Sequence, residues 1–277
     1  MESRDRLILP PPALSGCLYG ALLRDTRGRG LSGPALYNHF PASPLVTVTW
    51  VFHGALHLVE GGRIRPGALP AVSVAGPQPA PVTSWSPGAV LALTQAFKPE
   101  AWAALSGSAP GGVSPETRPL TEAVAPGPLR DAVGAVVGPE DLAGFEAALR
   151  PLWEERRPDA WQGAVGTGLG DWVRATVLRA ATGSTGRSLR QAQRRVKALT
   201  GHSRRELALY AQVEALWQLA RESEAPLAQV ALEGGFSDQS HMGRAVRRVT
   251  GHSPAALTRA IAEDEAFWAY RLLGEWI

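Results

Sequence analysis

The chain has 277 residues, of which 45% are apolar, so it is long and apolar enough to bury two cores and is not a disordered protein. Its single cysteine, Cys17, excludes an internal disulfide and a cysteine-rich zinc site. The net charge is +3, but residues 160–260 hold fourteen Lys and Arg against seven Asp and Glu, which leaves the remainder acidic. This asymmetry is typical of a protein in which one domain binds nucleic acid.

The sequence predicts neither a membrane protein nor an enzyme. No stretch approaches the ~18 consecutive apolar residues of a membrane span, and no charged-then-apolar leader is present, so we expect a cytoplasmic protein. Cys17 stands in the sequence SGCLYG without an activating neighbour, which predicts a buried apolar residue rather than a nucleophile. We assign no catalytic residue and no cofactor.

Residues 1–110 are expected to form a β-rich domain that binds an effector. Residues 1–14 end in three prolines and predict an extended arm. Short runs rich in β-branched and aromatic residues follow, separated by Gly, Pro and Ser, and they predict a small β-sandwich or barrel. The predicted strands lie at residues 17–23, 45–59, 71–75 and 89–97.

Aromatic residues and histidines of this domain are its candidate site residues. Trp50, Phe52 and Trp85 could line an effector pocket, because such pockets are mostly apolar and aromatic; ordinary core packing is the alternative. The set His39, His53, His57 and Glu60 invites a metal site. However, two histidines four residues apart on one strand would lie ~13 Å apart, so no metal is expected.

From residue 99 the pattern becomes helical. Residues 128–137 and 139–157 predict amphipathic helices within the segment 111–160, which we interpret as a helical linker or dimerisation segment. Packing of these helices on the β-rich domain is the alternative. The glycine-rich stretch 157–170 is the predicted boundary, and residues 161–277 are the predicted all-α domain.

An internal repeat organises the all-α domain. The sequence LTGHS at 199–203 returns as VTGHS at 249–253, an offset of 50 residues, which indicates two copies of one supersecondary unit. In the helix before the first copy, the predicted buried stripe is Ala192, Val196 and Leu199. The predicted outward residues of that helix are Arg190, Gln193 and Arg194. Residues 203–222 predict one long helix that joins the two copies.

The second copy predicts a complete helix-turn-helix between residues 226 and 254. A short helix after Pro226 should end at the glycines 234–235, and Ser237 or Asp238 can cap a second helix. On that helix the spacing of Met242, Val246 and Val249 predicts a buried stripe. The residues left facing outward near its amino end are Gln239, Ser240, His241, Gly243 and Arg244. From periodicity alone, an ordinary helical hairpin with a basic face is the alternative.

The wording of this segment decides between these alternatives. The pattern A-x-x-x-G-F-S-D-Q-S-H-x-x-R followed by T-G-x-S-P resembles the second helix-turn-helix of AraC/XylS-type transcription regulators over about thirty residues. The resemblance implies an α+β protein, in which a β-rich, cupin-like domain and further helices precede an all-α domain with two helix-turn-helix motifs. Operator DNA is the implied partner; a small-molecule effector, RNA polymerase and a second copy of the chain are further candidates.

The first copy departs from the family pattern. Ala192 and Val196 stand where leucine and phenylalanine are usual, and the segment 182–187 is longer than a compact turn. The resemblance still places Arg190, Gln193 and Arg194 where family members touch DNA, and Arg and Gln can each bond two atoms of a purine edge. Two alternatives stay open: an architectural protein with degenerate readers, and a DNA-repair alkyl acceptor, for which Cys17 has no cysteine partners.

Overall fold

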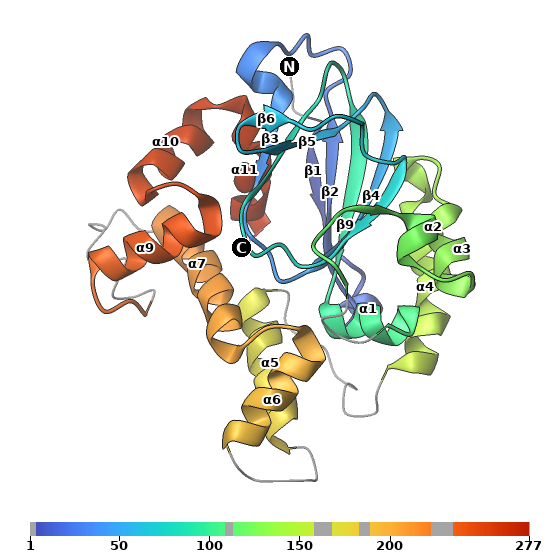
Figure 1. Ribbon diagram of the computed structural model, residues 1–277, viewed down its shortest axis with the longest axis vertical. Coiled ribbons are helices and arrows are strands. Elements are labelled where there is room, and N and C mark those ends of the chain that lie inside the picture. Colours follow the sequence, from blue (N-terminus) through green and yellow to red (C-terminus); the bar gives the residue numbers. More distant parts are fainter. Residues whose placement is uncertain (1–3, 109–112, 158–167, 183–188, 223–234, 277) are drawn as a thin grey trace.

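The computed structural model describes residues 4–108, 113–157, 168–182, 189–222 and 235–276, and two antiparallel sheets form its N-terminal half (Figure 1). In these residues the larger sheet has the strand order β1 (Arg6–Ile8), β2 (Leu18–Asp25), β9 (Leu91–Phe97), β4 (Val46–His53), β7 (Val72–Ala75) and β10 (Arg118–Pro119). The smaller sheet has the order β3 (Tyr37–Phe40), β8 (Val82–Trp85), β5 (His57–Glu60) and β6 (Arg63–Ile64). The predicted β-rich N-terminal domain is confirmed.

The predicted run 45–59 divides at Gly54, and its two parts, β4 and β5, belong to different sheets. Gly54 has a φ of +78°, and a Cβ added there would lie 2.1 Å from the carbonyl oxygen of Ala89. Both the backbone conformation and the close approach require a residue without a side chain. The chain therefore crosses from one sheet to the other at this glycine.

The two faces of the larger sheet have different neighbours. On β4, Val48 and Trp50 alternate with Thr47 and Thr49, so that the two pairs point to opposite faces. Trp50 is 1% exposed, and its Nε1 donates a hydrogen bond of 2.9 Å to the carbonyl oxygen of Val133. The face that carries Trp50 therefore packs against helices, and the threonine face points away from them.

Helices cover that core face of the larger sheet (Figure 1). They are α1 (Pro99–Ser106), α2 (Leu120–Ala123), α3 (Pro128–Gly134) and α4 (Leu142–Arg156). Leu142, Phe145 and Leu149 of the last helix share one hydrophobic core with the sheet, and Leu152 is partly buried against that core. These helices therefore pack on the β-rich domain, and their role as a dimerisation segment stays a prediction.

The N-terminal residues differ from the predicted extended arm. Strand β1 pairs with β2, and a 3₁₀ turn, η1 (Pro12–Leu14), follows it. Leu14 is 1% exposed and lies in the core of the N-terminal half. The three prolines precede or begin this turn rather than an unpaired arm, because proline fits the first position of a helical turn as well as an extended chain.

The C-terminal half is helical, as predicted. Its described elements are α5 (Leu169–Thr182), α6 (Leu189–Thr200), α7 (Arg204–Glu222), α9 (Gln239–Thr250), α10 (Pro254–Glu263), the 3₁₀ turn η5 (Glu265–Phe267) and α11 (Trp268–Trp276). Helix α7 is the predicted long helix. The expected short helix at 226–233 and most of the glycine-rich boundary, residues 158–167, lie outside the described residues. No helix among the described residues is long and apolar enough to cross a membrane.

Candidate nucleic-acid interface

Helix α9 begins and ends where the sequence predicts a recognition helix to do so. Gly235 has a φ of +78°, and Phe236 is 3% exposed and fills the corner before the helix. The Oδ1 atom of Asp238 accepts a hydrogen bond of 2.7 Å from the backbone N–H of His241, which makes Asp238 the N-cap. At the other end Gly251, with a φ of +80°, closes the helix.

The predicted two faces of α9 are present. Met242, Val246 and Val249 are buried. The exposed residues of the helix are Gln239, Ser240, His241, Arg244, Arg247 and Arg248, and Gly243 is half-buried. An exposed amino-terminal face with polar side chains and a basic continuation is the arrangement that reads base edges and contacts phosphates.

Helix α6 repeats this construction fifty residues earlier. The hydroxyl of Thr200 donates to the carbonyl oxygens of Val196 and His202 at 2.8 and 3.3 Å. The hydroxyl of Thr250 donates to the carbonyls of Val246 and His252 at the same two distances. The duplication inferred from the sequence is therefore also a duplication of hydrogen bonds. The predicted outward residues of α6, Arg190, Gln193 and Arg194, are all exposed.

The buried stripe of α6 is weaker than the sequence predicts. Val196 is 1% exposed, but Ala192 and Leu199 are only half-buried. The small side chain of Ala192 reaches fewer neighbours than a leucine would, so less apolar area is removed from water. The core around α6 is correspondingly small: it contains Trp172, Val173, Ala180, Val196 and Leu207.

We call the helix-turn-helix that contains α6 the first reader and the one that contains α9 the second reader. Helix α7 takes part in the cores of both readers. Leu207, near its start, packs with α5 and α6, whereas Tyr210, Val213 and Leu216 pack with α9 and the helices that follow it. Its first turn is closed by Ser203 and Glu206, each of which accepts a backbone hydrogen bond from the other. One rigid element therefore joins the two exposed recognition helices.

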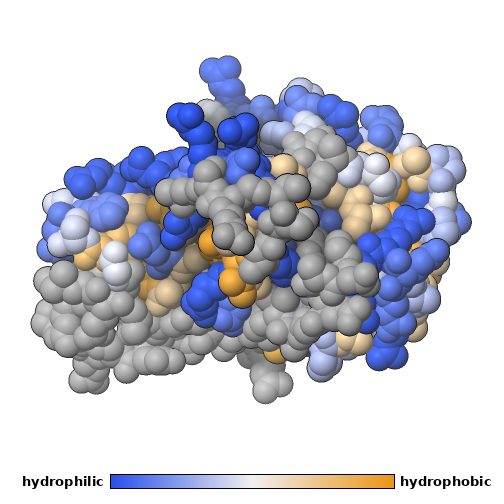
Figure 2. Space-filling model, turned by 90° about the horizontal axis from the view of Figure 1, so that it is seen from below, coloured by the Kyte–Doolittle hydropathy of each residue, from blue (hydrophilic) through white to orange (hydrophobic). Residues whose placement is uncertain are grey.

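Hydrophilic residues cover most of the described surface on the lower side of the molecule, and a smaller apolar area lies near its middle (Figure 2).

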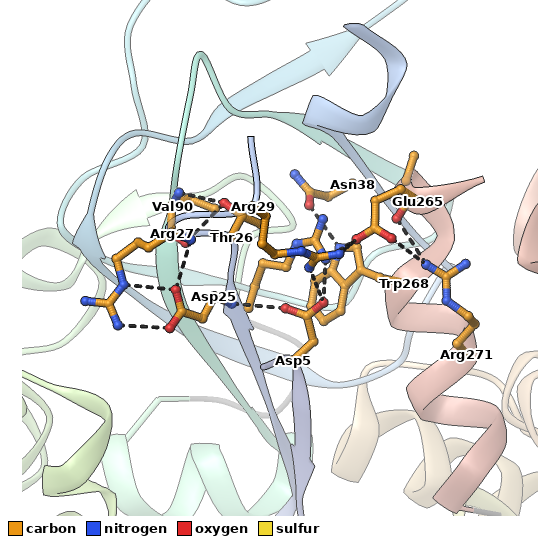
Figure 3. Close-up of polar contacts among 12 residues, drawn as sticks. Asp5, Asp25, Thr26, Arg27, Arg29, Asn38, Val90, Glu265, Trp268 and Arg271 are labelled. Atoms are coloured by element: carbon orange, nitrogen blue, oxygen red, sulfur yellow. Dashed lines mark hydrogen bonds and ion pairs between the residues drawn. The ribbon is translucent and has the colours of Figure 1, made fainter. Parts of the chain in front are cut away.

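Charged residues hold the second helix-turn-helix against the N-terminal half (Figure 3). We call these residues, Asp5, Arg24, Arg29, Glu265 and Arg271, the Glu265 cluster. Glu265 Oε1 lies 2.8 Å from Arg24 Nη1 and 2.6 Å from Arg29 Nη2, and both arginines also pair with Asp5. Asp5 directly precedes β1, Arg24 lies in β2, and Arg29 follows β2, whereas Glu265 precedes α11. The cluster therefore joins segments 241 residues apart.

The Glu265 cluster predicts weaker docking in acid. Burial raises the pKa of Glu265, but the hydrogen bond and charge of Arg24, together with Arg29, outweigh burial and hold that pKa below its ordinary 4.5. A lowered pKa contributes stability above the unfolded value, and this contribution is lost as the pH falls through the folded value. Near-ultraviolet circular dichroism should therefore show a loss of tertiary signal below about pH 4.5. A Glu265→Gln variant lacks the titrating group, and an identical acid step in it would contradict this assignment.

The first helix-turn-helix is held by a different contact. Glu100, in the first turn of α1, is 3% exposed and accepts hydrogen bonds from Trp172 Nε1 at 2.5 Å and Arg179 Nη2 at 3.2 Å. Burial raises the pKa of Glu100, and the hydrogen bond from Trp172 and the charge of Arg179 oppose that rise. Each reader thus has its own polar contact with the N-terminal half, at a different place on it.

A cavity of about 550 Å³ lies between the two halves. The threonine face of the larger sheet and residues of the smaller sheet line it on one side. Tyr210, Val213 and Glu214 of α7 and Val249 of α9 line it on the other. Beside it, the backbone N–H of Ala42 donates a hydrogen bond of 2.7 Å to the carbonyl oxygen of Val249, at the end of the recognition helix.

The aromatic residues predicted for an effector pocket do not line this cavity in the described part of the chain. Trp50 is in the core on the opposite face of the sheet, and Phe52 packs against that core. The ring centroid of Trp85 lies 5.7 Å from that of His57. None of the three is among the described lining residues of the cavity. The sequence feature that could have indicated the cavity is the alternation along the strands, in which small and hydroxyl residues that face the cavity alternate with large apolar residues that face the core.

The cysteine and the histidines that the sequence offered as candidate site residues were also located in the structure. Cys17 is fully buried, and burial raises the pKa of its thiol, so it stays protonated and a poor nucleophile. His39 Nδ1 lies 3.0 Å from Thr83 Oγ1, and its ring packs on Phe267 at the boundary between the two halves. Among the described residues, no three His, Cys, Asp or Glu side chains gather as metal ligands would.

These helices define a DNA-binding protein, and the match to a known family agrees. Residues 164–260 match the model of a family described as a helix-turn-helix domain. The chain therefore carries an AraC-type helix-turn-helix domain, and the protein is a DNA-binding transcription regulator. No curated protein matches the chain.

Solved structures similar to the chain include several of ToxT from Vibrio cholerae. One is 11% identical, with a TM-score of 0.39 over 79% of this chain and 93% of that chain. A second, from strain O395, is 11% identical, with a TM-score of 0.40 over 82% and 95%. A third, of ToxT with a bound unsaturated fatty acid, is 13% identical, with a TM-score of 0.36 over 80% and 93%.

Proposed function

We propose that a small, largely apolar effector controls the DNA binding of this regulator from the cavity between its halves. The observation that carries the proposal is the composition of the wall: sheet residues form one side, and residues of α7 and α9 form the other. A volume of about 550 Å³ lies within the range of small-molecule sites, ~300–1,000 Å³. A molecule in this cavity touches the helix that joins both readers.

The proposed control follows from differential binding. A ligand that contacts both walls binds the docked arrangement more tightly than any arrangement in which the halves separate, so it shifts the population toward the docked one. Both recognition helices have exposed outer faces in the docked arrangement. The ligand would therefore change how the pair of readers is held on the N-terminal half rather than uncover them.

The DNA contacts are proposed residue by residue. In the first reader they are Arg190, Gln193 and Arg194, and in the second they are Gln239, Ser240, His241, Gly243 and Arg244. A second copy of the chain, RNA polymerase and a cytoplasmic location are further proposals, which rest on the sequence resemblance. An architectural protein with degenerate readers is the alternative, and the experiments below separate it from a regulator.

A footprint on DNA upstream of the protein's own gene tests the DNA-reading part. With two readers on one rigid helix, a protomer should protect two patches on one face of the duplex, about one turn or ~10 bp apart. Base substitutions under α9 should weaken binding by ~1–3 kcal/mol each, and those under α6 by less, because the smaller core of α6 holds it less firmly. A single protected patch per protomer would overturn the two-reader arrangement.

Arg244 provides the sharpest single-residue test of the second reader. It is exposed on α9 one turn after Ser240 and His241. We expect Arg244→Ala to weaken specific binding by ~1–3 kcal/mol, measured by titration of a labelled operator, because Arg bonds base edges and phosphates from this position. Arg259→Ala is the matched control: it removes the same charge from an exposed position on α10. Equal losses in the two variants would reduce the role of Arg244 to general attraction.

A further inference from the structure

The charged groups of the cavity set a limit on its ligand. We propose that the cavity selects an uncharged, largely apolar molecule whose hydroxyl or carbonyl group bonds to a row of side-chain hydroxyls on the larger sheet, and that it rejects carboxylates. This inference rests on the proposed control by an effector and names the chemical class of that effector.

Apolar side chains form most of the cavity wall. Both sheets and α7 contribute them; representative residues are Leu22, Leu45, Leu58, Val82, Val213 and Trp217. These side chains give a long ligand apolar surface to bury, at ~25 cal/mol for each Å² removed from water. The body of the ligand is therefore expected to be hydrocarbon.

The hydroxyl row lies on three neighbouring strands. Thr49 of β4 stands opposite Ser73 of β7 on one side and Thr94 of β9 on the other. All three residues line the cavity. The Oγ1 atoms of Thr49 and Thr94 are 3.0 Å apart and share a hydrogen bond. The row therefore offers uncharged donors and acceptors on a wall that is mostly apolar.

Ser73 is the member of the row to which the described part of the chain offers no hydrogen-bond partner. It is 1% exposed, and its Oγ atom has no hydrogen-bond partner among the described residues. A buried hydroxyl without a partner costs ~1–3 kcal/mol, so a ligand group that bonds it recovers this free energy. A hydroxyl or carbonyl oxygen is the matching group, because a serine hydroxyl donates to either and accepts from the former.

Among the residues that the structure describes, the cavity wall holds a single cation, and that cation is already paired. Its charged residues, among those that the structure describes, are Glu60, Arg65, Glu116 and Glu214. This cation, Arg65, pairs at 3.0 Å with Glu60, and both side chains are more than half exposed. A ligand carboxylate deeper inside would be desolvated without a counter-charge, which costs far more than burial of a hydroxyl.

Glu214 strengthens this exclusion from the side of α7. It is 6% exposed and accepts hydrogen bonds from the hydroxyl of Tyr19 and, at 2.7 Å, from the backbone N–H of Leu169. Burial raises the pKa of both Glu214 and Tyr19. A carboxyl group and a phenol are neutral or negative in every protonation state, so neither group supplies a positive charge. An ionised Glu214 would in addition repel a ligand carboxylate.

Three probes with one ten-carbon chain test the selection: 1-decanol, decylamine and decanoate. Titrated into the full-length protein and followed calorimetrically, 1-decanol should bind at least about tenfold more tightly than decanoate and more tightly than decylamine. Equal or tighter binding of decanoate would overturn the exclusion of anions, and tighter binding of decylamine would overturn the preference for an uncharged group.

A pair of serine variants tests the hydroxyl row. Ser73→Ala removes a hydroxyl that has no partner among the described residues, so the fold should be kept, and the affinity for 1-decanol should fall about tenfold. Ser86→Ala is the matched control, because the Ser86 hydroxyl is also buried without a described partner but is not in the described cavity wall. Equal affinities in the two variants would overturn the role of the row.

The same probes separate this inference from the proposed function. Operator binding is measured with and without saturating 1-decanol. If 1-decanol binds more tightly than the other two probes but does not change the affinity for the operator, control of DNA binding from the cavity is refuted, whereas the proposed ligand class is supported. A changed operator affinity with decanoate as the tightest probe would keep the control and refute the ligand class.

Discussion

Replacement of Glu265 by alanine should free the second helix-turn-helix from the N-terminal half and lower the free energy of unfolding by ~3–5 kcal/mol. Arg24 is 5% exposed at its side chain. Loss of the carboxylate leaves Arg24 and Arg29 with Asp5 as the one carboxylate that they share among the described residues. Removal of one partner from a buried ion pair is costly because the other charge stays in a poorly solvated place.

Hydrogen exchange locates this effect. In Glu265→Ala, amides of α10 and α11 should exchange faster, while those of α5 and α6 keep their protection. Glu263→Ala is the control, since Glu263 is an exposed acidic residue on the same segment. Unchanged exchange in α11 of the Glu265 variant would show that apolar packing alone docks the second reader.

Replacement of Glu100 by alanine should have the complementary effect on the first reader, again at a cost of ~3–5 kcal/mol. The variant leaves the Nε1 of Trp172 and the guanidinium of Arg179 without their buried acceptor. Amides of α5 and α6 should then lose protection, and those of α11 should keep it. Glu122→Ala, which removes an exposed carboxylate from α2, is the control. Loss of protection in both readers at once would mean that α7 transmits the change.

The local features of the second reader could be predicted from the sequence because local rules determine them. The cap at Asp238, the left-handed Gly251 and the stripe Met242, Val246 and Val249 all follow from residues within one helix. The first reader was predicted less well. The repeat predicts which positions of α6 face the core, but it does not predict how deeply each side chain is buried. Burial also depends on side-chain size, and the side chain of Ala192 is small.

The contacts between the halves could not be predicted from the sequence. The Glu265 cluster needs Arg24 and Glu265, 241 residues apart, to meet, and no periodicity indicates such a meeting. The cavity was missed for a related reason. Alternation along β4 shows that Trp50 and Thr49 point to opposite faces, but not which face the helices will cover. The size and aromatic character of Trp50 favoured it as a pocket residue, but Trp50 packs against the helices and Thr49 lines the cavity.

The alternation along the strands of the larger sheet has an evolutionary consequence. Val48, Trp50 and Leu93 hold the sheet to its helices, whereas their immediate neighbours Thr49 and Thr94 face the cavity. Substitutions at the second set leave the first set in place, so the chemical preference of the cavity is free to drift while the scaffold stays intact. Descendants of this chain could therefore come to answer to different molecules with few changes and little loss of foldability.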